Sequence, residues 1–316
     1  MRTVVVGAGV SGLSTAAELL RAGHEVTLVS ADPVAATTSY LAAAVWFPTA
    51  AGPPDRVNSW GTETFTHLEE LAQNSTPGVR MCESLALYRT QPGPVDWAHS
   101  VREFRPARKS ELPPGYAAGL RFAVPLVEMP IFLPWLRNQV IAAGAHWVSR
   151  TIGELAEITD LTPDVVINCA GLRAGELVGD PTVHPIRGQI VRVTNPGLSM
   201  SVRDEAHPLG RAYAHPRATD CILGGTLEPH QWDTTPNPEL TQSILRRCRD
   251  IAPRLDGCEI IETLVGLRPG RPNVRLELDH TTLPDTPVVH NYGHGGAGIT
   301  IGYGCAREVA ELVAAL

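Results

Sequence analysis

The stretch Val4-Val5-Val6-Gly7-Ala8-Gly9-Val10-Ser11-Gly12 decides the fold of this 316-residue chain. A short β-branched run precedes the glycines, and residues 13–22 carry apolar side chains at helical spacing after them. Gly23 ends the predicted helix, and residues 25–30 form a second predicted strand that leads to Asp32. Strand, glycine turn, helix, strand and acid, in this order, are typical of a dinucleotide-binding unit.

Each part of this pattern has a physical function. Gly7 allows the tight turn, Gly9 lets a pyrophosphate approach the backbone, and Gly12 lets the helix and strand pack closely. The start of the helix offers unpaired N–H groups and a partial positive charge to the phosphates. The predicted phosphate contacts are Gly7, Ala8, Gly9, Val10, Ser11 and Gly12. Asp32 can accept hydrogen bonds from a ribose hydroxyl, so the pattern predicts an adenine dinucleotide without separating FAD from NAD.

The composition is that of a globular protein that can bury a sizeable core and form two domains, with 43% hydrophobic and 19% charged residues. The net charge of −7 gives no electrostatic reason to expect binding to nucleic acid or to an anionic membrane. Six dispersed cysteines without a CxxC pair predict reduced thiols in a cytoplasmic protein. We expect neither a cleaved signal, because the fingerprint begins at residue 4, nor a membrane span.

Periodicity and breakers predict the remaining elements. Helices are expected over 58–73, 131–143, 238–251 and 299–315, and strands over 79–89, 119–124, 126–129, 146–149, 164–169, 188–193, 221–226 and 260–267. The buried-type strand 164–169 indicates a return to the dinucleotide-binding domain, which is therefore discontinuous. Tyr213 is expected in a loop and Arg268 in a proline-rich turn.

A second glycine stretch lies near the C-terminus, directly before the last predicted helix. Gly293, Gly295, Gly296 and Gly298 could turn the chain, or could bring a helix N-terminus close to a ligand. A reduced flavin carries negative charge near N1 and O2, where such a positive helix end would be useful. His290 and His294 have the spacing of one helical turn, but the residues between them argue against a helix and no third ligand is evident, so no metal is expected.

Taken together, the motifs resemble the D-amino acid oxidase family across essentially the whole chain, in that family's order and spacing. The matching segments are Gly7–Gly12, Asn168-Cys-Ala-Gly171, Gly188-Gln-Ile190, Tyr213 with Pro216, Gly224-Gly-Thr226, Gly266-Leu-Arg-Pro-Gly-Arg-Pro272 and His290-Asn-Tyr-Gly-His-Gly-Gly296. The last segment is close to the family signature, and it is far more specific than the opening GxGxxG.

The resemblance implies FAD as the cofactor, with further contacts at both ends of the chain. These contacts are Asp32, Thr37, Thr38, Ala43, Ala44, Val45, Ile152, Gly295, Gly296, Gly298, Ile299 and Thr300. The implied fold class is α/β, with an FAD-binding Rossmann-like domain and a discontinuous α+β substrate domain. The expected FAD-binding domain comprises 1–50, 140–187 and 268–316, and the substrate domain comprises 51–139 and 188–267.

The resemblance also assigns the substrate contacts. Arg268 would pair with the substrate carboxylate, the Tyr213 hydroxyl would donate to the same carboxylate, and the Gly296 carbonyl would accept from the substrate amine. The implied reaction is oxidative deamination of neutral D-amino acids by hydride transfer to flavin N5, without a protein base. The products are 2-oxo acids, ammonia and hydrogen peroxide, and the partners are the D-amino acid and oxygen, with a homodimer left open.

Three positions depart from other members of the family. Leu209 stands where vertebrate members carry a tyrosine that covers the site, which argues against a mobile lid. Leu227 replaces a tyrosine of fungal members and an arginine of D-aspartate oxidases. Arg217 leaves D-aspartate or D-glutamate oxidation open as an alternative. From other classes, an NAD-dependent dehydrogenase and a non-catalytic flavin-binding module also stay open.

Overall fold

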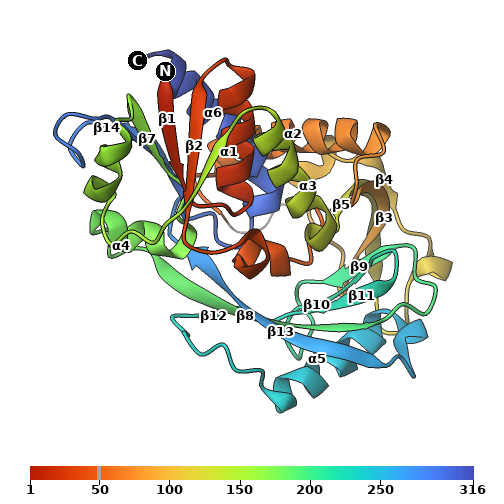
Figure 1. Cartoon of the computed structure of the whole chain (residues 1–316). Coiled ribbons are helices and arrows are strands. Elements are labelled where there is room, and N and C mark those ends of the chain that lie inside the picture. The colour runs from red at the N-terminus through yellow and green to blue at the C-terminus, as the bar shows by residue number, and fades with distance from the viewer. Residues whose placement is uncertain (48–50) are drawn as a thin grey trace.

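The structure is a computed structural model that describes residues 1–47 and 51–316, without the side chain of Asp96. The predicted domain boundary at residue 50 lies outside the described residues. Two β-sheets dominate the molecule, one above the other in Figure 1, and the two chain ends lie close together beside the upper sheet. Among the described residues, no helix is long and apolar enough to cross a membrane. All six cysteines are free, as predicted.

The first sheet has six strands in the order β14-β15-β7-β1-β2-β6. Their bounds are β1 (Arg2–Val6), β2 (Glu25–Ser30), β6 (His146–Ser149), β7 (Val165–Asn168), β14 (Arg275–Asp279) and β15 (Val288–Tyr292). All pairings are parallel except that of the edge strand β14. The opening run Val4–Val6 lies in β1 with both neighbours present, and its side chains are buried. This is the doubly wound sheet that the glycine fingerprint predicts.

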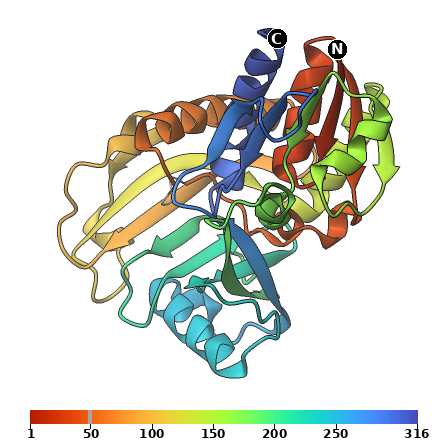
Figure 2. The ribbon, with the colours of Figure 1, turned by 90° about the vertical axis from the view of Figure 1, so that its left-hand side faces the viewer.

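The second sheet has nine strands in the order β12-β8-β11-β10-β9-β3-β5-β4, with β13 paired along β8. Their bounds are β3 (Val79–Tyr88), β4 (Arg102–Pro106), β5 (Ala118–Val127), β8 (His184–Thr194), β9 (Ser201–Asp204), β10 (Ala212–Pro216), β11 (Asp220–Gly224), β12 (Glu228–Pro229) and β13 (Ile260–Gly270). Helix α5 (Pro238–Ile251) packs Ile244, Leu245 and Cys248 into a core with Val191 and Ala214 of this sheet. The predicted fold class, a Rossmann-like unit with a second α+β unit, is confirmed (Figure 2).

Four of the other helices belong to the unit of the first sheet, and α2 packs between α6 and strands β3 and β5 of the second sheet. They are α1 (Val10–Arg21), α2 (Pro54–Gln73), α3 (Met129–Ala142), α4 (Ala174–Val178) and α6 (Gly298–Ala314). Helix α6 packs between α1 and α2, and α3 packs against α1. One buried apolar cluster connects α1, α2, α3 and α6 with strands of both sheets, and it includes Val5, Leu13, Phe122 and Leu126. The residue boundaries of the two domains therefore stay a prediction.

The structure corrects the predicted elements at several points. Tyr213 lies in strand β10 rather than in a loop, and Arg268 lies in β13 rather than in a turn, because backbone pairing with neighbouring strands holds both segments extended. The predicted strands 119–124 and 126–129 are one strand, β5, and Met129 already belongs to α3. Strands β4, β9, β12 and β14 were not predicted, because they are short and polar and are stabilised by pairing rather than by an apolar pattern.

Helix α6 can approach α2 because Gly304 has no side chain. A Cβ built there would lie 2.5 Å from both the Cα and the O of Trp60. We expect Gly304→Ala to lower the stability by about 1–3 kcal/mol, since neither helix can move without disturbing the core. Gly302→Ala in the same helix is the matched control, because no described atom lies within 4 Å of its Cβ position. Thermal melting of both variants tests this account, and equal melting temperatures would contradict it.

Candidate functional site

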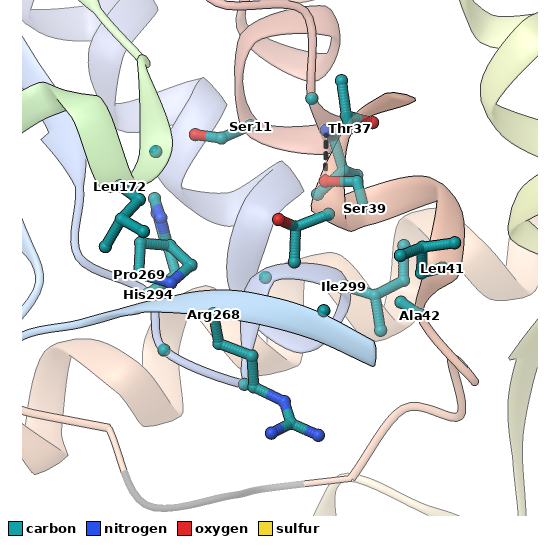
Figure 3. Close-up of a pocket in the computed structure, with 18 of the residues that line it drawn as sticks. Ser11, Thr37, Ser39, Leu41, Ala42, Leu172, Arg268, Pro269, His294 and Ile299 are labelled. Carbon is teal, nitrogen blue, oxygen red and sulfur yellow. Dashed lines mark hydrogen bonds between the residues drawn. The ribbon is translucent and has the colours of Figure 1, made fainter. Parts of the chain in front are cut away.

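A cavity of about 600 Å³ lies between the carboxyl ends of the first sheet and one face of the second sheet. Every site residue predicted from the sequence lines it, except Gly12. These residues are Gly7, Ala8, Gly9, Val10, Ser11, Asp32, Thr37, Thr38, Ala43, Ala44, Val45, Ile152, Tyr213, Arg268, Gly295, Gly296, Gly298, Ile299 and Thr300. Figure 3 shows Thr37 and Ser39 side by side, Ser11 apart from them, and Arg268 projecting away from all three.

The first glycine turn is held by backbone contacts that exclude any side chain. Gly7 has a φ of 106°, and a Cβ built on it would lie 2.4 Å from the carbonyl oxygen of Cys169. A Cβ on Gly12 would lie 1.9 Å from the carbonyl oxygen of Gly7, so Gly12 sets the contact between helix and strand and does not face the cavity. The close packing expected of Gly12 is therefore present, whereas its predicted direct cofactor contact stays a prediction.

The N-terminus of α1 opens into the cavity. Gly9 precedes the helix without a side-chain cap, and the Val10 N–H donates to Oγ of Ser39 at 3.0 Å (Figure 3). Ser39 also lines the cavity, and the sequence did not predict it as a site residue, although it directly follows Thr37 and Thr38. The Thr38 hydroxyl donates to the carbonyl of Leu267 in β13 at 2.9 Å, which links this loop to the second sheet. The remaining unpaired N–H groups suit the phosphates of a dinucleotide.

The second glycine turn joins β15 to α6 and ends in another helix N-terminus beside the cavity. Gly295 has a φ of 55°, and its N–H donates to the carbonyl of Pro269 at 2.8 Å. This bond ties the turn to the end of β13, next to Arg268. Helix α6 begins at Gly298 without a side-chain cap. The N-termini of two helices therefore border the cavity, and their positive ends would suit the pyrophosphate and the flavin ring of an extended FAD.

The strand register brings the substrate contacts to one face of the second sheet. Tyr213 in β10 lies directly opposite Gly224 in β11 and Arg203 in β9, and Gly224 lies opposite Ile190 in β8. Directly opposed residues in neighbouring strands share a face, and Ile190, Tyr213 and Arg203 all line the cavity. Arg268, further along β13, lines the same cavity.

Two glycines make room for the two predicted carboxylate-binding side chains. A Cβ on Gly188 would lie 2.1 Å from Nη1 of Arg268, and a Cβ on Gly224 would lie 2.0 Å from Cζ of Tyr213. Nη1 of Arg268 donates to the carbonyl of Thr226 at 3.2 Å. Gly296 contacts the same arginine, because its Cβ position is 3.6 Å from Cδ of Arg268. The structure therefore brings the three predicted substrate contacts together at one end of the cavity.

Burial sets the protonation states at this end. It raises the pKa of Tyr213, so that this hydroxyl stays protonated and can donate. His215 stacks on Tyr213, with ring centroids 4.5 Å apart, and its Nδ1 lies 2.8 Å from Oγ of Ser201. Burial, with the neighbouring charge of Arg203, lowers the pKa of His215 well below its usual value, and the ring is neutral at neutral pH.

Several polar residues of the cavity were not found from the sequence. Four of them, Arg203, Glu205, Arg211 and His215, lie close together. All four lie in or beside β9 and β10, which were not predicted as strands, so their common face was not evident. The alternation of Arg203 with Glu205 and of Arg211 with Tyr213 and His215 is the signal that could have indicated it.

The three positions that depart from the family pattern do not all line the cavity. Leu227 lines the cavity. Arg217 and Leu209 are absent from its described lining, and Nη2 of Arg217 donates instead to the carbonyl of Ala42 at 3.0 Å. The described part of the chain also contains no group of three residues able to hold a metal ion.

A dinucleotide-binding sheet that shares a cavity with a second sheet is the arrangement expected of a two-domain oxidoreductase. The family model described as DAO, FAD dependent oxidoreductase, matches residues 2–312. The chain belongs to this family of FAD-dependent oxidoreductases, and FAD is its cofactor.

Individual relatives agree with this assignment. The chain is 49% identical to a D-amino-acid oxidase of Rubrobacter xylanophilus, covering 99% of this chain and 96% of the relative. It is 36% identical to a D-aspartate oxidase of Homo sapiens, covering 99% and 94%. Among solved structures, glycine oxidase from Geobacillus kaustophilus superposes with a TM-score of 0.81 at 18% identity, covering 99% and 95%, which supports the fold alone.

The buried His294 makes the stability of the folded protein depend on pH. Its Nε2 lies 3.0 Å from Oδ1 of Asn291, and burial lowers its pKa to about 4. Because the unfolded chain takes up a proton below pH 6.5 and the folded chain does not, stability falls as the pH drops from 6.5 towards 4, by up to about 1.4 kcal/mol per pH unit. We expect His294→Gln to reduce the difference in melting temperature between about pH 7 and about pH 5. An unchanged difference would contradict this role.

Proposed function

We propose that this protein is a D-amino acid oxidase that converts neutral D-amino acids into 2-oxo acids, ammonia and hydrogen peroxide. The observation that carries the proposal is the position of Arg268 and Tyr213, which flank one end of the cavity beside the turn that begins α6. The identity of 49% with a D-amino-acid oxidase along nearly the whole chain supports the same activity.

The substrate is held at three points. The Arg268 guanidinium binds the α-carboxylate with a two-pronged fork, a geometry that a lysine ammonium cannot supply. The Tyr213 hydroxyl donates to the same carboxylate, and the Gly296 carbonyl accepts from the substrate amine. With carboxylate and amine fixed, only one enantiomer directs its Cα–H towards the cofactor.

The residues of the two glycine turns hold FAD, together with Asp32, Thr37, Thr38, Ala43, Ala44, Val45 and Ile152. FAD held by these residues would supply the hydride acceptor for the substrate Cα–H and the route for the electrons to oxygen. Tyr213 acts as a hydrogen-bond donor rather than as a base, because burial favours its neutral form. The domain boundaries given above, the cytoplasmic location and the homodimer belong to the same proposal.

Release of hydrogen peroxide tests the activity. We expect the purified protein to be yellow and to release peroxide with D-alanine and D-valine but not with their L-isomers, because the three contacts fix one hand of the substrate. Addition of catalase controls for other sources of signal. Release of peroxide with the L-isomers would refute the proposal, and so would the absence of peroxide with every D-isomer. A colourless protein with nicotinamide-dependent activity would favour a dehydrogenase.

Substitution of Arg268 and Gly188 tests the carboxylate site. Arg268→Met should keep the flavin spectrum and raise KM for D-alanine at least about tenfold, because charge-assisted hydrogen bonds are lost. Gly188→Ala should also raise KM, since its methyl group would occupy the place of the Arg268 guanidinium. Gly302→Ala serves as the glycine control, and wild-type KM values in both site variants would contradict the assignment.

A further inference from the structure

One buried carboxylate has no part in the site described above. Asp180 lies two residues after helix α4, and only 8% of its side chain is exposed. Its Oδ2 accepts hydrogen bonds from Nε of Arg271 at 3.0 Å and from the Tyr292 hydroxyl at 2.9 Å. Its Oδ1 accepts from the backbone N–H and the hydroxyl of Thr182, at 3.0 and 2.6 Å. Both oxygens have partners, so the carboxylate is held in one orientation.

This carboxylate keeps its charge at neutral pH. Burial favours the neutral acid, but the hydrogen bonds from its three partners outweigh this effect and hold the pKa of Asp180 well below its usual range. The contact with Arg271 is therefore a charge-assisted hydrogen bond, a class roughly twice as strong as hydrogen bonds between neutral groups.

The two partners of Oδ2 come from different sheets. Arg271 directly follows β13, the strand of the second sheet that carries Arg268. Tyr292 is the last residue of β15 in the first sheet, and the glycine turn that carries Gly296 begins directly after it. Asp180 therefore bridges the segment with the proposed carboxylate contact and the segment with the proposed amine contact.

Each of these segments is otherwise anchored in its own sheet. Arg268 lies opposite Ile186 of β8, and its Nη1 donates to the carbonyl of Thr226. Tyr292 lies opposite Arg275 of β14, whose Nη1 donates to the Tyr292 hydroxyl at 2.9 Å. The distance between the two proposed substrate contacts therefore depends on the contacts that join the sheets at this point.

Two further contacts join the same segments. The Gly295 N–H donates to the Pro269 carbonyl at 2.8 Å. Gly293, with a φ of 82°, packs against Arg271, because a Cβ built there would lie 2.8 Å from Cβ of that arginine. Asp180 differs from these contacts, since it reaches in from a third segment, 91 and 112 residues earlier in the chain than its two partners. Exchange of this one side chain therefore alters the junction without changing either substrate segment.

We propose that Asp180 is a positioning residue that sets the distance between the Arg268 guanidinium and the Gly296 carbonyl, and with it the direction of the substrate Cα–H. This inference rests on the proposed function, in which Arg268 binds the α-carboxylate and Gly296 binds the amine. Asp180 is absent from the described lining of the cavity, and it acts through Arg271 and Tyr292. Rates depend steeply on such distances, because a misplacement of about 1 Å can cost about 100-fold.

A comparison of two ligands on the FAD-loaded enzyme separates positioning from general damage to the site. Propionate has the carboxylate of D-alanine without its amine, so it uses Arg268 but not the Gly296 carbonyl. In Asp180→Asn, we expect kcat for D-alanine to fall about tenfold or more, because the Cα–H is misdirected. The Kd of propionate, measured from the change in the visible flavin spectrum, should change less than about threefold, since β8 still holds Arg268.

Asp164→Asn is the matched control. Asp164 also pairs with an arginine, Arg2, but it lies directly before β7, at the end of the first sheet remote from the cavity. This variant should leave both values unchanged. Wild-type kcat in a folded Asp180→Asn variant would overturn the proposal, and so would equal losses of kcat and of propionate binding. Absence of peroxide with D-alanine in the wild type would instead refute the proposed function itself.

Tyr292→Phe tests the same bridge from its other side. The phenylalanine keeps the buried ring and removes the hydroxyl that donates to Asp180. We expect kcat for D-alanine to fall about threefold or more with the Kd of propionate unchanged, and wild-type kcat would contradict the proposal. In an Asp180→Ala background the effect of Tyr292→Phe should largely disappear, because both substitutions break one bridge. Effects that multiply would overturn the proposal.

Discussion

The close approach of backbone to backbone at Gly7 and Gly12 is the constraint on which the rest of the structure depends. A methyl group at Gly12 would lie 1.9 Å from the Gly7 carbonyl, so α1 can begin directly above β1 only with glycine there. This contact places the helix N-terminus at the carboxyl edge of the parallel sheet. The turn before α6 directs a second helix N-terminus into the same cavity. In the proposed binding mode, the backbone geometry of these two turns provides the contacts to the phosphates and the flavin ring, and Asp32 adds a side-chain contact to the ribose.

In the second sheet, glycines likewise make room for the side chains that are proposed to bind the substrate. Gly188 and Gly224 leave space on neighbouring strands, and the side chains of Arg268 and Tyr213 fill it. Neither side chain can occupy its position if the strand beneath carries a Cβ. The bond from the Gly295 N–H to the Pro269 carbonyl then joins the substrate sheet to the cofactor turn. The residues proposed to hold the substrate and those proposed to hold the cofactor are thus connected through the end of β13.

A feature can be predicted from the sequence when the interactions that define it lie within one short segment of the chain. Both glycine turns, helix α5 and the strands β1, β2, β6 and β7 of the first sheet were predicted, because their signals lie within short segments. The strand environments of Tyr213 and Arg268 were not, since pairing with distant segments defines them. Arg203 was missed for the same reason: only the register of β9 with β10 places it opposite Tyr213. Ser39 contacts Val10 across 29 residues, which no local pattern indicates.

The central claim is that the cavity holds a D-amino acid with its Cα–H directed at the cofactor. Anaerobic mixing of the FAD-loaded enzyme with saturating D-alanine, either unlabelled or deuterated at Cα, tests it most directly. The account predicts loss of the visible flavin absorbance in one turnover, markedly slower with the deuterated substrate. An oxidised spectrum that persists, or the same rate with both substrates, would contradict it.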